Sequence, residues 1–100
     1  MISGWESMKT KFLVVVEKGL TNFSAYSPDL PGCIATGKTV EETLETMHSA
    51  IDFHLEGMVE NGEELPVPKS LYTYVRETDE ISADDILTSV EIDLPQLAHA

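Results

Sequence analysis

A single amphipathic stretch in the middle of the chain most constrains how this sequence folds. Apolar residues recur at steps of three and four, at Val40, Leu44, Met47, Ile51, Leu55 and Met58. This spacing places them on one stripe of an α-helix. Thr39 and Glu42 have the spacing of a capping box at the helix start, and Asn61-Gly62 is typical of a helix end. A helix with one apolar stripe needs a second layer to cover it, so the flanking segments must supply that layer.

Short segments with the pattern of β-strands precede and follow this helix in the sequence. Residues 11–17 contain a continuous apolar run from Phe12 to Val16, which is typical of a buried strand. Apolar and polar residues alternate along 23–26 and again along 90–94, and residues 33–36 follow a turn rich in proline. The sequence therefore predicts an α+β fold: an antiparallel three- to four-stranded sheet in the order β-β-β-α-β, with one long helix packed on one face.

The remaining segments set the expected boundaries. Residues 71–75 are interpreted as an edge strand or an extended arm, and residues 82–85 as a turn or a helix start. Residues 1–10 show no periodicity and are expected to form a flexible leader. The folded domain is predicted to span residues 11–95, followed by a C-terminal tail at 96–100.

The charge balance excludes several classes of function. The chain has 6 Lys and Arg against 18 Asp and Glu, a net charge of −12. Such a balance disfavours a protein that binds bare nucleic acid or an anionic membrane, and it favours a basic partner or simply high solubility. The sequence shows no apolar run near the ~18 residues of a membrane span, no signal peptide and only one cysteine. We therefore expect a soluble, cytoplasmic protein.

The acidic residues are placed unevenly. On a helical wheel one side of the helix carries five carboxylates, those of Glu41, Glu45, Asp52, Glu56 and Glu60. No Lys or Arg lies between Thr39 and Pro68 to relieve their repulsion. This side is either a solvated surface or a docking face for a basic partner.

Phe53 falls beside these carboxylates rather than in the apolar stripe. It is interpreted as an interface anchor, as a side chain folded under the loop after Gly62, or as an exposed residue without a role. The candidate partner-binding residues are Glu45, Asp52, Phe53, Glu56 and Glu60.

The sequence argues against an enzyme. His48 and His54 are six residues apart, so they lie on different flanks of the helix and do not form a metal-chelating pair. Cys33 has apolar neighbours and is expected to fill the core. No nucleophile elbow or glycine-rich phosphate loop is present. We predict no catalytic residue, no cofactor and no metal site.

Two motifs carry a family resemblance. The run Pro-Asp-Leu-Pro-Gly-Cys at 28–33, followed by Gly-x-Thr-x-Glu-Glu at 37–42, resembles the HicB-like antitoxins of type II toxin–antitoxin systems. The likeness continues into Ser89–Pro95 and covers about residues 11–95. It implies a partial ribonuclease-H-like fold, and such a fold does not by itself imply nuclease activity.

The resemblance also implies a partner. Members of the family neutralise a small basic HicA-type toxin that cleaves mRNA, and an acidic protein is suited to mask the RNA-binding surface of such a toxin. Self-association as a dimer or a higher oligomer is a further expectation. Many members carry a C-terminal DNA-binding module, whereas only five residues follow Pro95 here, so direct DNA binding is not expected. The alternative function is a stand-alone oligomeric module that binds a ligand or regulates another process without a cognate toxin.

Overall fold

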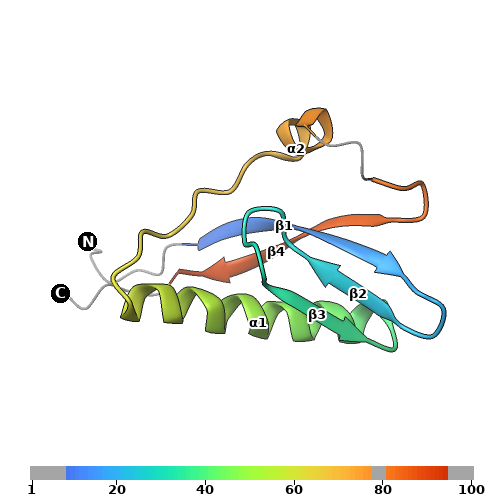
Figure 1. The fold of residues 1–100 in the computed structure, drawn as a ribbon, viewed down its shortest axis with the longest axis horizontal. Coiled ribbons are helices and arrows are strands. Elements are labelled where there is room, and N and C mark those ends of the chain that lie inside the picture. Colours follow the sequence, from blue (N-terminus) through green and yellow to red (C-terminus); the bar gives the residue numbers. More distant parts are fainter. Residues whose placement is uncertain (1–8, 78–80, 95–100) are drawn as a thin grey trace.

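The computed structural model describes residues 9–77 and 81–94. The chain forms four strands and two helices, in the order β1 (Lys9–Lys18), β2 (Phe23–Tyr26), β3 (Ile34–Gly37), α1 (Val40–Glu60), α2 (Leu71–Glu77) and β4 (Ile86–Asp93). Figure 1 shows α1 lying along one face of the sheet and α2 on the opposite side. The predicted α+β architecture is confirmed, with the single long helix on one face of an antiparallel sheet.

The sheet is built around β1. Its strand order is β3-β2-β1-β4, and every neighbouring pair is antiparallel. The pairing of β1 with β4 is unbroken from Lys9 opposite Asp93 to Val16 opposite Ile86. Five consecutive residues of β1, Phe12 to Val16, are buried, as the apolar run predicts. A strand buried on both faces has to occupy the interior of the sheet, with a covering layer on each side.

The core lies between the sheet and α1. Phe12, Val14 and Val16 point to this side and belong to one buried cluster with Met47, Ile51 and other residues. The cluster is completed by Ala25, Leu30, Cys33, Ala35, Leu55, Val90 and Ile92. Leu44 and Met58 of the predicted stripe are partly buried against it. The predicted apolar stripe of the helix therefore does face the sheet.

The start of α1 has the predicted cap with one difference. The Thr39 hydroxyl accepts a hydrogen bond of 3.0 Å from the Glu42 N–H, as a capping threonine does. The Glu42 carboxylate accepts from the N–H of Lys38 at 2.6 Å, rather than from that of Thr39 itself. At the other end Gly62 adopts a positive φ of 73°, and the N–H of Glu63 donates to the Met58 carbonyl at 2.8 Å, which closes the last turn.

Gly37 and Thr43 let β3 turn tightly into α1. Thr43 is fully buried, and its hydroxyl donates to the Thr39 carbonyl at 2.7 Å. A Cβ on Gly37 would come within 2.6 Å of the Thr43 hydroxyl oxygen and 2.8 Å of the Thr43 backbone nitrogen. Glycine is therefore needed at position 37 because a backbone approaches it closely.

The prediction for residues 71–75 is wrong. They lie in α2, which neither extends the sheet nor forms an extended arm. Leu-Tyr-Thr-Tyr-Val has the composition of a strand, but the side chain of Ser70 accepts from the Thr73 N–H at 3.1 Å and caps a helix. Residues 82–85 do form a turn, in which the Asp85 N–H donates to the Ser82 carbonyl at 3.1 Å.

Two strand boundaries differ from the expectation. β1 begins at Lys9, so Lys9 and Thr10 belong to the sheet rather than to the predicted leader. β4 begins at Ile86, four residues before the predicted start, and ends at Asp93. The rest of the predicted leader, residues 1–8, and the predicted tail, residues 96–100, lie outside the described residues.

We expect the Gly37→Ala variant to lose about 1–3 kcal/mol of unfolding free energy, the usual cost of forcing an extra carbon into a packed site. Gly57→Ala is the matched control, because a Cβ there meets nothing within 4 Å and the residue lies inside α1. This control should gain about 0.5–1 kcal/mol from helix propensity. Urea unfolding followed by circular dichroism measures both, and a neutral Gly37→Ala would contradict the close-approach explanation.

Candidate protein-binding surface

The outer side of α1 carries a row of carboxylates, which we call the acidic face: Glu41, Glu45, Asp52, Glu56 and Glu60. Four of the five side chains are exposed, and that of Asp52 is half-buried. The helix holds them on one side because the opposite stripe is fixed against the sheet by Met47, Ile51 and Leu55. The structure thus brings the predicted acidic residues together on one accessible surface.

Little within α1 offsets this negative charge. The helix contains no Lys or Arg from Val40 to Glu60. Within the described part of the chain its one ion pair joins His48 Nδ1 to Asp52 Oδ2 at 3.3 Å, and this pair is charged only when the imidazole is protonated. Among the described residues, no salt bridge involves Glu45, Glu56 or Glu60. These three carboxylates therefore present negative charge directly to solvent.

Phe53 lies next to the acidic face and is exposed. Its exposed fraction is 79%, so the structure excludes the interpretation that the side chain folds under the loop after Gly62. An aromatic ring left in water beside exposed carboxylates is suited to enter an apolar pocket of a partner whose rim is basic.

The cations gather on the other side of the molecule, which we call the far face of the sheet. Alternation along β1 places Lys9 and Lys11 there, beside Leu13 and Val15. Lys9 pairs with Asp93 of β4 at 2.9 Å. In the segment after α1, Lys69 pairs with Glu77 at 3.1 Å, and Arg76 lies 5.6 Å from the ring centre of Tyr72. Four of the six Lys and Arg residues thus lie away from the acidic face.

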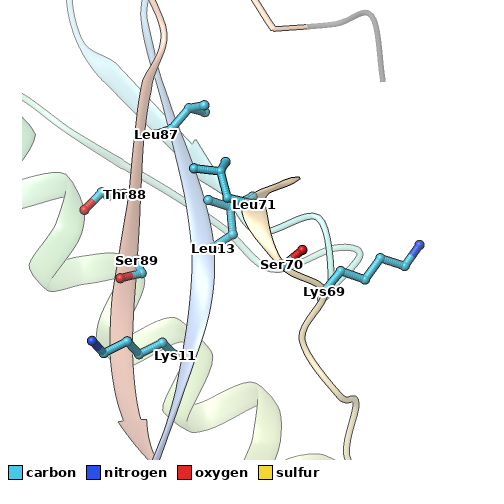
Figure 2. Close-up of a pocket in the computed structure, with 8 residues that line it drawn as sticks. All are labelled: Lys11, Leu13, Lys69, Ser70, Leu71, Leu87, Thr88 and Ser89. Carbon is cyan, nitrogen blue, oxygen red and sulfur yellow. The ribbon is translucent and has the colours of Figure 1, made fainter. Parts of the chain in front are cut away.

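The far face contains an open hollow of about 420 Å³ between the sheet and residues 69–71. Figure 2 shows Leu13, Leu71 and Leu87 gathered around it. The side chains of Lys11 and Lys69 lie at its rim and point away from the three leucines in different directions. The hollow is thus lined by leucines and by Ser70, Thr88 and Ser89, without converging charge.

Helix α2 is held to the far face by hydrogen bonds as well as by Leu71. The hydroxyls of Tyr26 in β2 and Tyr74 in α2 share a hydrogen bond of 2.8 Å. The Lys69 N–H, just before α2, donates to Asp29 at 3.1 Å. No residue of α2 is fully buried. Burial of the Tyr26 side chain, and then its hydrogen bond with Tyr74, raises the pKa of the Tyr26 phenol above its usual range.

A second groove lies between α1 and β4. It has a volume of about 520 Å³ and is lined by Leu44, Glu45, His48, Ser89 and Val90. β4 forms an edge of the sheet, so this groove opens beside a strand whose outer side has no neighbour within the described chain. Sequence reasoning missed this groove, because it depends on which strand the helix leaves uncovered.

The described residues contain no group of three or more His, Cys, Asp or Glu side chains placed to hold a metal ion. None of the helices found in residues 9–77 and 81–94 is both long and apolar enough to cross a bilayer. Cys33 is buried, as predicted, and burial raises the pKa of its thiol. His48 and His54 both lie on α1, and His99 falls outside the described residues.

Comparison with known proteins assigns the family. Residues 12–100 match the model of the HicB-like antitoxin of bacterial toxin–antitoxin systems. The chain belongs to the HicB-like antitoxin family. An uncharacterised 14.9 kDa protein of Haemophilus phage HP1 is 36% identical over 84 residues, which are 84% of this chain. The chain spans 62% of the length of that phage protein.

Solved structures of HicB proteins have the same fold. The N-terminal domain of the Burkholderia pseudomallei antitoxin HicB superposes with a TM-score of 0.71 at 26% identity, over 85% of this chain and 100% of that domain. A chain of a HicA3 and HicB3 toxin–antitoxin complex superposes with a TM-score of 0.70 at 28% identity, over 84% of this chain and 99% of that one. The family resemblance carried by the Pro-Asp-Leu-Pro-Gly-Cys motif is confirmed.

The raised pKa of Tyr26 leads to a prediction for alkaline pH. The unfolded phenol ionises near pH 10, whereas the folded one holds its proton to higher pH. The stabilisation is complete below about pH 10 and falls as the pH rises toward the folded-state pKa. Thermal melts from pH 8 to 11.5 should show a steeper loss of Tm in the wild type than in Tyr26→Phe. Tyr72→Phe, which changes an exposed tyrosine, should keep the wild-type slope.

Proposed function

We propose that this HicB-like protein neutralises a small basic HicA-type toxin that cleaves mRNA. The observation that carries the proposal is the acidic face of α1, on which four exposed carboxylates, those of Glu41, Glu45, Glu56 and Glu60, have no cationic partner among the described residues. The family assignment supplies the class of partner, since family members act in toxin–antitoxin systems.

The proposed mechanism is competition for one basic surface. A protein that binds RNA holds the phosphates with Lys and Arg side chains. Glu45, Asp52, Glu56 and Glu60 would occupy these cations, and Phe53 would fill an apolar gap between them. Opposite charges on the two surfaces also speed the encounter, because a potential that extends over about 10 Å steers the two proteins together.

The other expectations belong to the same proposal. The protein acts in the cytoplasm, where an mRNA-cleaving toxin would act, and it acts by binding rather than by catalysis. It also forms a homo-oligomer. The experiment is a search beside the gene for a reading frame that encodes a short basic protein, then co-expression of the two proteins, affinity purification and sizing. A stoichiometric complex supports neutralisation, whereas absence of a complex together with no rescue of toxin-expressing cells overturns it and favours the stand-alone module.

We expect the triple variant Glu45→Gln, Glu56→Gln and Glu60→Gln to bind the toxin about tenfold more weakly. Each exposed ion pair contributes about 0.2–1 kcal/mol, so three lost pairs amount to roughly that factor. The matched control changes three carboxylates elsewhere, with Glu17→Gln, Glu77→Gln and Asp84→Asn, and alters the net charge equally. Titration calorimetry at two salt concentrations should show a smaller salt dependence for the first variant only. Equal losses in both would mean that overall charge, and not the acidic face, determines binding.

Truncation of Phe53 tests the apolar part of the surface. We expect Phe53→Ala to weaken toxin binding by about 10- to 30-fold, as for an aromatic anchor at an interface, with the salt dependence unchanged. Tyr72→Ala is the control, since Tyr72 is also an exposed aromatic residue but lies on α2, on the opposite side of the sheet. If the two variants bind equally well, Phe53 is not an anchor.

A further inference from the structure

We propose that two copies of this chain pair through the outer edges of their β4 strands and form one continuous eight-stranded sheet. The inference identifies the surface used for self-association, and it can be tested without a toxin. It rests on the exposed edge of β4, on the charges around that edge and on the groove between β4 and α1.

β4 presents the longer free edge of the sheet. The sheet ends at β3 on one side and at β4 on the other. β3 has four residues, whereas β4 has eight and presents a backbone edge of about 27 Å that pairs with no other strand of residues 9–77 and 81–94. Its sequence, Ile-Leu-Thr-Ser-Val-Glu-Ile-Asp, contains no Pro, Gly or Lys, and its pairing with β1 has no bulge. β4 thus lacks several of the features that commonly prevent edge-to-edge pairing.

Charge allows an identical copy to approach here. The two carboxylates of β4 both lie on the far face, opposite two lysines of β1. Asp93 is ion-paired with Lys9 at 2.9 Å, and Glu91 lies opposite Lys11 in the register. The edge is therefore locally balanced, in contrast to the acidic face of α1. The repulsion between two acidic copies therefore comes from the rest of their charge and not from this edge, and a basic partner gains little from the edge.

Only certain registers keep like faces together. Side chains alternate between the two faces of a strand, and two residues directly opposite each other in an antiparallel pair lie on the same face. In a pair of identical strands, the numbers of two opposite residues must therefore be both odd or both even. With Ser89 opposite Ser89 of the second copy, Ile86 faces Ile92 and Thr88 faces Val90. This register covers Ile86, which is 40% exposed, and leaves Asp93 beyond the new ladder. Centring on Val90 would leave Ile86 uncovered and place Asp93 opposite Leu87. We therefore assign the Ser89 register.

The groove between α1 and β4 supplies further contact area. A paired strand alone falls short of the roughly 800 Å² per partner that a stable interface buries. The groove, lined by Leu44 and Val90 among others, lies at the level of Ser89, where the two-fold axis would pass. Its lining also includes Glu45 and His48. The two grooves would meet across the axis, so that apolar side chains lining them, such as Leu44, add contact beside the new ladder.

Cysteine cross-linking tests the interface and its register. On the axis, Ser89→Cys would face its own copy at a Cα separation of about 4.5–5.5 Å, which suits a disulfide. We expect this variant to form covalent dimers under mild oxidation. Thr36→Cys, exposed on β3 at the other edge, is the control and should stay monomeric on a non-reducing gel. The native Cys33 is buried and does not compete.

Sedimentation of the full chain provides the second measurement. We expect the wild type to dimerise. Ser89→Lys should weaken dimerisation at least tenfold, because it places two ammonium groups across the axis, whereas Thr36→Lys should have no effect. Added salt should strengthen the dimer, since two copies of charge −12 repel each other. Toxin binding through the acidic face should weaken with salt, so the two proposals can fail separately. A wild type that is still monomeric at about 1 mM overturns the inference, because this concentration is roughly a hundred times a dimer Kd of ~10 μM. Cross-linking of the Thr36→Cys variant alone also overturns it.

Discussion

The burial of β1 on both of its faces is the constraint on which the rest of the structure depends. One layer of structure must shield Phe12, Val14 and Val16 from water, and a second layer must shield Leu13 and Val15 on the opposite face. α1 provides the first, and the segment that leads to α2 lies over the second (Figure 1). Because β1 also pairs along its length with β4, it binds the N-terminal and C-terminal parts of the described chain into one sheet. The positions of both candidate surfaces follow from this arrangement.

The two layers that cover β1 differ in how much apolar surface they bury, so they are expected to differ in local stability. α1 contributes Met47, Ile51 and Leu55, all fully buried. α2 contributes no buried residue and relies on the Tyr26–Tyr74 hydrogen bond and the contact between Lys69 and Asp29. Hydrogen bonds of this kind add about 1 kcal/mol each, less than a buried leucine or isoleucine. Local opening of the chain should therefore begin at α2 rather than at α1.

Sequence patterns predicted the parts of the fold whose burial follows a simple rule. The stripe from Val40 to Met58 has the period of a helix, and the unbroken apolar run from Phe12 to Val16 indicates a strand buried on both faces; both were interpreted correctly. The segment at 71–75 was not, since its strand-like composition is overridden by the cap at Ser70. A helical wheel places Phe53 outside the apolar stripe, but its exposure could be decided only by the structure, because the loop after Gly62 could have covered it. The groove between α1 and β4 could not, because it depends on the lateral position of the helix over the sheet.

The acidic face is not something that the fold requires. Glu41 and Glu45, Asp52 and Glu56, and Glu56 and Glu60 are like charges four residues apart on one helix, and each such pair costs about 0.2–0.5 kcal/mol. A lysine at one position of each pair would convert the repulsion into attraction without touching the core. The helix tolerates the repulsion because Met47, Ile51 and Leu55 hold it against the sheet. Negative charge at such a cost, beside an exposed phenylalanine, supports the proposal that this face binds a basic partner. The balanced charges at the edge of β4 have no such cost, and they suit that edge to contact with a like copy.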